Sequence, residues 1–361
     1  MQTAEANLKV WAAAFVGAPA AAVTAALVVL AAALGVLGVL AGSVQPSRAA
    51  DTGVTCFGRQ ATITGSGTII GTDGNDVIIG SDNADTMEGL RGDDRICARG
   101  GGDMVAGGLG EDKLAGDEGD DFMRGDVFNP SGHADGGDDD WMYGGDGVDR
   151  MVGDSAGPSA SGGGDDHLFG EAGMDSMTGD SRASVSDATG AGDDVLDGGV
   201  GPNEGLVGDS NAARNASGDN GDDVLIMGPD GVRFFAVGDH NTFSPGQTAT
   251  GAGDDKIIGG SADEILVGES SADSVMDAGA DVISGRGGSD QLFGDNVNFD
   301  GNATIGTMGG DDKLNGEAGD DTLRAGPAND TLDGGENTDN CDGEAGTDDN
   351  AKRCEVLAGV P

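Results

Sequence analysis

The sequence predicts an all-β fold in which the chain winds into a solenoid with two parallel sheets. Three observations lead to this prediction: a period of nine residues, one recurrent apolar position in each nine, and 71 glycines among 361 residues. Glycine permits the positive-φ turns that reverse the chain, and a short run of side chains pointing outward, inward and outward is typical of a β-strand. Two nines then make one coil with two turns and two strands, and stacked coils make two facing sheets.

Composition and charge restrict the classes of protein that fit. Asp and Glu number 65 against 18 Lys and Arg, which gives a formal net charge of −47. This charge excludes a basic nucleic-acid-binding surface. Aromatic residues make up only 4% of the chain, fewer than a conventional core of this length contains. The chain is therefore either a disordered acidic polymer or a fold whose charge is cancelled by a cation.

The first segment, residues 1–49, has the features of an export signal. No charged residue occurs from Val10 to Ser47, and the most apolar part, Val23–Leu40, is 18 residues long. Ser47 and Ala49 are small residues at the places that a signal peptidase reads. The alternative is an uncleaved membrane anchor, since 18 apolar residues can span a bilayer. We expect a secreted protein, or a cell-surface protein in contact with the membrane if the segment is retained.

Residues 50–70 are expected to form an N-terminal cap with a leading strand, and regular nines follow over residues 71–124. In all six of these nines the sixth residue is Asp and the eighth is apolar. The apolar residues are Ile78, Met87, Ile96, Val105, Leu114 and Met123. We predict that the eighth residue of each unit faces the core between the sheets.

Long and short units alternate over residues 125–315. A long unit opens with Gly-Asp or a close variant, as in "GDSAGPSASGGGDDHLF" (Gly153–Phe169), and a short unit such as "GEAGMDSMT" (Gly170–Thr178) follows. Alternate turns share an edge of the stack, so the insertions are predicted to form loops along one edge. Regular nines resume over residues 316–351, and residues 352–361 are expected to form a C-terminal cap or tail. The long units begin at Gly125, Gly153, Gly179, Gly208, Gly238, Gly268 and Gly294.

The nines resemble the nonapeptide G-G-x-G-x-D-x-U-x of RTX, or haemolysin-type, calcium-binding repeats. The resemblance covers about Gly71 to Ala351 and implies a parallel β-roll that binds several Ca²⁺ ions. The stretch "CFGRQATITGSGTIIGTDGNDVIIG" (Cys56–Gly80) and the ending "RIC" of the third nine also resemble exported actinobacterial members of this group.

The family pattern implies a set of aspartate ligands for calcium. One edge of the roll would begin with Asp76, Asp94 and Asp112, and the other edge would begin with Asp85 and Asp103. The second edge weakens where Asn203 and Glu264 replace aspartate, and we expect fewer ions around residues 200–265. The full set of expected ligands is Asp76, Asp85, Asp94, Asp103, Asp112, Asp121, Asp140, Asp149, Asp166, Asp175, Asp194, Asp223, Asp255, Asp281, Asp290, Asp312, Asp321, Asp330 and Asp339.

Elementary energetics also favours a cation. Stacked coils repeat at about 4.8 Å, so each edge would carry a ladder of like charges, and neighbouring carboxylates repel by about 1 kcal/mol even in water. One buried apolar side chain per nine contributes roughly 1.5–3 kcal/mol, while ordering each residue costs about 1 kcal/mol or more. Ca²⁺ takes 6–8 oxygen ligands from carboxylates and carbonyls. Binding and folding are therefore expected to be one process.

Four cysteines behind an export signal suggest disulfides in an oxidising compartment. In the exported members of the family that the chain resembles, paired cysteines near each end staple the caps. The resemblance implies the pairs Cys56–Cys97 and Cys341–Cys354, the second of which would close the last coil. Buried free thiols are the alternative.

The remaining motifs give little support for catalysis. "GDSAG" (Gly153–Gly157) matches the G-x-S-x-G of serine hydrolases, but "GDSRA" at Gly179 and "GDSNA" at Gly208 show that it is a repeat feature. We therefore expect a non-enzymatic protein. The alternatives are a calcium-dependent adhesion protein that uses the long loops to bind an extracellular protein or glycan, and an enzyme with its site on the roll.

Overall fold

The computed structural model describes residues 53–201, 205–218, 221–229, 235–275, 278–298, 300–346 and 349–360. The expected export signal or anchor, 1–49, and the short-edge residue Asn203 lie outside these ranges. All regular elements of the described residues are strands. No described helix has the length and apolar character needed to cross a membrane.

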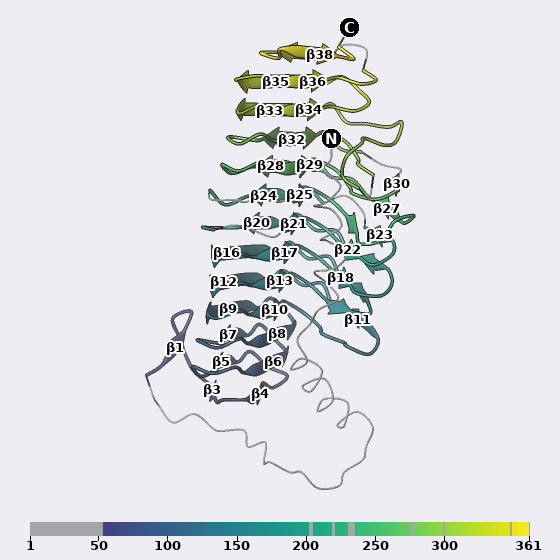
Figure 1. The fold of residues 1–361 in the computed structure, drawn as a ribbon. Coiled ribbons are helices and arrows are strands. Elements are labelled where there is room, and N and C mark those ends of the chain that lie inside the picture. Colours follow the sequence, from purple (N-terminus) through teal and green to yellow (C-terminus); the bar gives the residue numbers. More distant parts are fainter. Residues whose placement is uncertain are drawn as a thin grey trace. The chain divides into compact units, whose positions relative to one another are not determined.

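Two parallel sheets of 13 strands each form the stack of coils (Figure 1). Consecutive strands alternate between the sheets along most of the chain, so each sheet collects every second nonapeptide. Sheet 1 contains β3 (Ile63–Thr64), β5 (Val77–Ile79), β7 (Arg95–Cys97), β9 (Lys113–Glu118), β12 (Trp141–Gly147), β16 (His167–Gly173), β20 (Val195–Asp197), β24 (Val224–Ile226), β28 (Lys256–Ile258), β31 (Val282–Ser284), β33 (Lys313–Ala318), β35 (Thr331–Glu336) and β37 (Asn350–Lys352).

Sheet 2 lies opposite, and its strands come from the other nonapeptide of each coil. It contains β4 (Thr68–Ile70), β6 (Thr86–Arg91), β8 (Met104–Leu109), β10 (Phe122–Arg124), β13 (Arg150–Val152), β17 (Ser176–Thr178), β21 (Gly205–Val207), β25 (Phe235–Val237), β29 (Ile265–Val267), β32 (Gln291–Phe293), β34 (Thr322–Arg324), β36 (Asn340–Asp342) and β38 (Val356–Ala358). The predicted parallel β-roll is confirmed.

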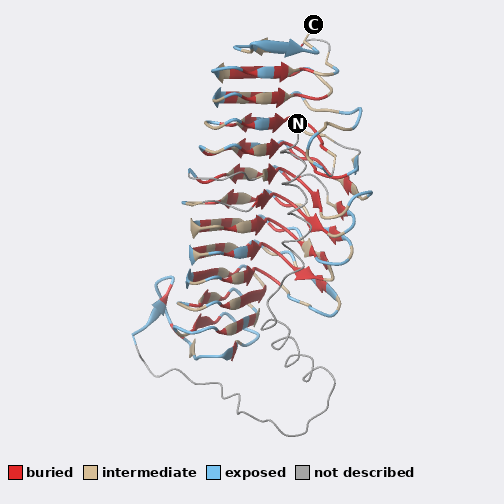
Figure 2. Ribbon diagram, in the orientation of Figure 1, coloured by how far each residue is buried: buried red, intermediate tan, exposed pale blue. Residues whose placement is uncertain are grey.

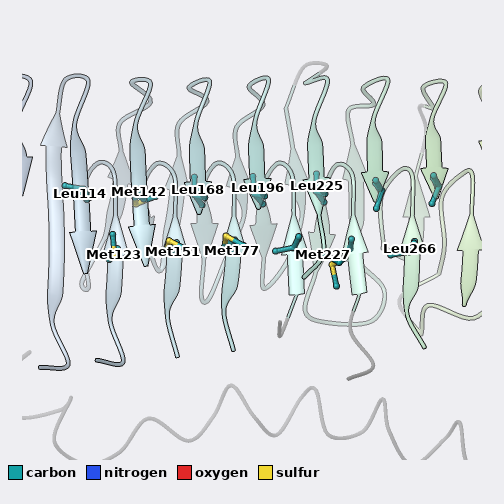
Figure 3. Packing of buried hydrophobic residues seen from close by; sticks show 14 of the residues in the cluster. Leu114, Met123, Met142, Met151, Leu168, Met177, Leu196, Leu225, Met227 and Leu266 are labelled. Carbon is teal, nitrogen blue, oxygen red and sulfur yellow. The ribbon is translucent and has the colours of Figure 1, made fainter. Parts of the chain in front are cut away.

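The core between sheets 1 and 2 consists of the eighth-position side chains. Leu114, Met142 and Leu168 stack along sheet 1, and Met123 and Met151 face them from sheet 2 (Figure 3). All five are fully buried. The prediction that the eighth residue faces the core is confirmed. Each strand contributes one side chain, so the core is a narrow row of single residues along each sheet.

The insertions of the long units form two further parallel sheets, drawn beside the main stack in Figure 1. Sheet 3 contains β11 (His133–Asp135), β15 (Ser159–Ser161), β19 (Ala188–Thr189), β23 (Ala216–Ser217), β27 (Thr248–Thr250) and β30 (Ser274–Val275). Sheet 4 contains β14 (Ala156–Gly157), β18 (Arg182–Ala183), β22 (Asn211–Ala212) and β26 (Asn241–Thr242).

These inserted sheets have a core of their own, and their strands are buried like those of the roll (Figure 2). Ala183 and Ala212 of sheet 4 cluster with Ala188 and Ala216 of sheet 3. Alanine is small enough to let two short sheets approach each other closely. The insertions lie along one edge, as the spacing indicated, but they are ordered by strand pairing where loops were expected.

Both ends of the roll carry a disulfide. Cys56 of β1 (Thr55–Cys56), which pairs antiparallel with β2 (Arg59–Gln60), is bonded to Cys97 of β7. Cys341 of β36 is bonded to Cys354, and the Cα atoms of the pair lie 5.9 Å apart. The first bond ties the hairpin to the third nonapeptide, and the second closes the last coil.

Candidate metal centres

The edge that carries the insertions, called the long edge here, contains one continuous column of sixth-position carboxylates. The backbone N–H of Asp76 donates to Oδ1 of Asp94 at 2.7 Å, and Asp94 donates in the same way to Asp112. The pattern repeats in every coil to the last one. The column comprises Asp76, Asp94, Asp112, Asp140, Asp166, Asp194, Asp223, Asp255, Asp281, Asp312, Asp330 and Asp349.

Sequence reasoning missed the final member of this column, Asp349. The N–H of Asp330 donates to its Oδ1 at 3.0 Å, so it continues the same geometry. The signal was present in its separation from Asp330, which is 19 residues and close to the length of one coil. Asp330 itself lies on the long edge, between Asp312 and Asp349.

The opposite edge, called the short edge, has an interrupted column. Asp85, Asp103, Asp121, Asp149 and Asp175 are linked by the same backbone-to-carboxylate hydrogen bonds, with lengths from 2.6 to 2.9 Å. Within the described residues, no acid continues this column between Asp175 and Glu264. From there the column resumes through Asp290, Asp321 and Asp339.

In most members of both columns the second carboxylate oxygen is buried and accepts no hydrogen bond. A buried polar atom without a partner is costly, and a buried charge even more so. Asp76 and Asp85 differ, because their Oδ2 atoms accept the backbone N–H of Thr72 and Ser81, each at 2.7 Å. The unpartnered atoms include Oδ2 of Asp94, Asp103, Asp112, Asp121, Asp140, Asp149, Asp166, Asp194, Asp223, Asp255, Asp281, Asp290, Asp312, Asp321, Asp330, Asp339 and Asp349.

Backbone carbonyls converge on these unpartnered oxygens because the first residue of most units is glycine. A Cβ atom at Gly144 would lie 2.6 Å from Oδ2 of Asp149 and 2.9 Å from the carbonyl oxygen of Gly170. A carboxylate of one coil and a carbonyl of the next therefore share a space that no side chain can enter. Ca²⁺ prefers this combination of carboxylate and carbonyl oxygens.

Burial makes these carboxylates hard to ionise without a cation. It raises the pKa of Asp103 on the short edge to about 7, and that of Asp112 on the long edge to about 8. Burial is the largest cause of both shifts, neighbouring carboxylates contribute in the same direction, and a backbone N–H donor opposes each shift. The residues thus fit a bound dication, which would favour the ionised form and supply the charge that the sequence lacks.

A third column of acids was not recognised as a set of ligands from the sequence. These residues are the second residues of the long units, and all of them are fully buried. The signal was the Gly-Asp opening of the long units, to which the sequence analysis gave no ligand role. The column comprises Asp126, Asp154, Asp180, Asp209, Asp239, Glu269 and Asp295.

The third column lies against the long-edge column and forms compact carboxylate trios with it. Oxygens of Asp154, Asp166 and Asp180 lie within 4.8 Å of one another, and so do oxygens of Asp180, Asp194 and Asp209. Burial raises the pKa of Asp180 well above its usual range, and the charges of Asp209 and Asp166 raise it further.

The hydrolase-like motif does not form a catalytic arrangement. Ser155 and its equivalents Ser181 and Ser210 are fully buried, and Oγ of Ser210 donates to the carbonyl of Gly190 at 3.2 Å. His240 occupies the same position one coil later, and its Nδ1 accepts the N–H of Ser210 at 3.2 Å. These residues form a buried polar file in the repeat.

Stacked nonapeptide coils with buried carboxylates at both edges define the class of acidic β-roll solenoids. Within that class, the model of the RTX calcium-binding nonapeptide repeat (4 copies) matches more than half of the chain, and the protein belongs to this family. The matched segments are residues 63–96, 98–130, 134–156, 160–181, 188–203, 249–275, 277–298, 299–331, 306–340 and 318–349. Searches of curated proteins and of solved structures find no match.

Proposed function

We propose that the protein is a secreted, non-enzymatic calcium-binding β-roll that folds as it binds several Ca²⁺ ions. The observation that carries the proposal is the row of buried, unpartnered carboxylate oxygens at both edges. Without cations these rows oppose folding, and with cations they join one coil to the next. The two disulfides and the apolar segment before residue 50 support an extracellular location.

The chain's own residues supply the binding chemistry. On the short edge, Asp149 offers one oxygen to the backbone N–H of Asp121 at 2.8 Å and keeps the other for a cation. The carbonyl oxygen of Gly170 borders the same space beside Gly144 as this second oxygen. A bound Ca²⁺ would neutralise the carboxylates there and fix the turn, and the strands on either side would then be held in register.

A calcium titration followed jointly by circular dichroism and calorimetry tests the proposal. We expect the spectrum to change from unfolded to β-rich as calcium is added, with heat released over the same concentrations. The variant Asp149→Asn should need more calcium, whereas Asp146→Asn, which removes an exposed carboxylate three residues away, should titrate like the original chain. A β-rich spectrum that chelation leaves unchanged at alkaline pH would rule the proposal out.

The outer face of sheet 3 favours a second candidate, a calcium-dependent interaction protein. Its strand register aligns Asp135, Ser161, Thr189, Ser217 and Thr250 in one file of short polar side chains. An ordered polar face of this kind suits an extracellular protein or glycan partner better than irregular loops would.

Shortening the insertions is a poor test of this second candidate, because it would remove strands such as β11 and β27. The substitution Thr189→Glu changes only the exposed face, and Lys256→Glu on sheet 1 is the matched control. The interaction protein would be favoured if the original chain captures a partner in the presence of calcium, and if Thr189→Glu abolishes this capture while Lys256→Glu does not. Capture that neither substitution changes would exclude this face.

A further inference from the structure

The acids of the third column are buried where each insertion leaves the roll. Strands β13, β17 and β21 of sheet 2 are each followed by one glycine and then by Asp154, Asp180 or Asp209. Strands β14, β18 and β22 of sheet 4 begin two residues after these acids. The column thus separates the roll from the inserted sheets. Its position lies outside the nonapeptide, whose acid is the sixth residue.

No hydrogen-bond donor satisfies the central members of this column. Both carboxylate oxygens of Asp154, Asp180 and Asp209 are buried and without a hydrogen-bond partner. The adjacent Ser155, whose hydroxyl could have donated, faces the carbonyl of Gly136 at 3.4 Å instead. Each trio combines two of these carboxylates with one from the long-edge column, which is Asp166 in the first trio and Asp194 in the second.

The histidine beside the column does not donate a hydrogen bond to it from Nδ1. His240 Nδ1 lies 3.5 Å from Oδ2 of Asp209, but this nitrogen already accepts the N–H of Ser210. Because this nitrogen accepts a hydrogen bond, it donates none to the carboxylate of Asp209, whose two oxygens have no hydrogen-bond partner.

We propose that the third column and the long-edge column together form a second file of divalent-cation sites, which fastens the inserted sheets to the roll. One site lies among Asp154, Asp166 and Asp180, and the next lies among Asp180, Asp194 and Asp209, so that Asp180 bridges them. The donors are carboxylate oxygens, which suit a hard cation such as Ca²⁺. The inference rests on the proposed calcium-dependent fold and adds sites that the nonapeptide pattern does not contain.

The test compares two triple variants of the full-length chain. D154N/D180N/D209N removes third-column carboxylates, and D165N/D193N/D222N removes the same number of exposed carboxylates from neighbouring turns. Bound calcium is counted by equilibrium dialysis and native mass spectrometry. We expect the first variant to lose about two ions per chain, one for each trio, while the control loses none.

Hydrogen exchange locates the effect of the lost ions. In the first variant the amides of β15, β18, β19 and β22 should exchange faster, while those of β16 and β20 in sheet 1 stay protected. If the triple variant does not fold, D180N alone serves, because both trios contain this residue. Unchanged ion counts and unchanged exchange in the inserted strands would overturn the inference, and would show that the carboxylates share protons.

The result also separates this inference from the proposed function. If the original chain folds without calcium at alkaline pH, where its buried carboxylates have to ionise, the proposed function fails. If the original chain requires calcium but the third-column variant binds as many ions as the control, only the second file of sites is excluded.

Discussion

The two edges of the roll are built from the same nonapeptide but differ in the number of buried acids that they carry. The short edge has one column of carboxylates, interrupted between Asp175 and Glu264 in the described residues, while the long edge has an unbroken column with a second file of acids beside it. Burial raises the pKa of Asp149 on the short edge to about 7, but it raises that of Asp166 on the long edge well above its usual range. The insertions therefore concentrate buried charge on one side, and we expect that side to depend most on cations.

Acid should replace calcium in folding the chain, and this is the largest effect that we predict. Carboxyl groups whose pKa is raised in the folded state bind more protons there than in the unfolded state, so stability falls as the pH rises. This stability is fully present below about pH 4, where unfolded aspartates titrate. It is lost as the pH rises through about 7 at Asp103 and about 8 at Asp112 and Asp312.

Circular dichroism of the chelated chain from pH 4 to 9 measures this transition. The chain should be β-rich in acid and unfolded at the alkaline end, and saturating calcium should abolish the dependence over the upper part of this range. Hydrogen exchange should show that the long edge continues to lose protection at a pH where the loss on the short edge is complete. A chelated chain that is equally unfolded at every pH would contradict the prediction.

We expect substitutions in the core to destabilise the protein by similar amounts in sheet 1 and in sheet 2, although the two edges differ. Leu196 of sheet 1 and Met177 of sheet 2 are both buried in the same file of side chains. Each of the substitutions Leu196→Ala and Met177→Ala should lower the free energy of unfolding by about 2–5 kcal/mol, because each leaves a cavity. Denaturant unfolding in saturating calcium measures both, and Val185→Ala, at an exposed residue of the insertion, is the control.

The disulfide at the C-terminal end should contribute less than the core but more than any exposed ion pair. Cys341 and Cys354 close a loop with a sequence separation of 13, for which the chain-entropy relation gives about 3 kcal/mol. Replacing both cysteines with serine should lower the unfolding midpoint in calcium and raise hydrogen exchange mainly in β36 and β38. Equal loosening along the whole roll would show that the last coil is not a separate cap.

The period of nine made the roll itself predictable. Most nonapeptides repeat the same two constraints: one inward apolar residue, such as Leu114, and one turn carboxylate, such as Asp112. The insertions escaped prediction because their lengths vary, so strands such as β15 and β19 recur at no fixed period. Their core residue is alanine, as at Ala160 and Ala188, and alanine carries almost no hydrophobic signal. The third column was overlooked because an acid after glycine is also the usual composition of an exposed turn.

The smallest effect that we predict is the loss of calcium affinity when one carboxylate is replaced. We compare two carboxylates from neighbouring turns, one at each edge. Asp255 of the long edge accepts the N–H of Asp223 and donates its own to Asp281, so acids flank it on both sides. Glu264 also has one unpartnered oxygen, Oε1, but it stands where the short-edge column resumes, and an acid of that column flanks it only on the side of Asp290 within the described residues. The substitution Asp255→Asn should lower calcium affinity about tenfold, corresponding to about 1.4 kcal/mol, and Glu264→Gln should lower it less. Calorimetric titration of both variants measures the difference. An equal or larger loss of affinity for Glu264→Gln would mean that the interruption of the short-edge column does not weaken calcium binding at Glu264. Each turn would then bind calcium independently of the other acids in its column.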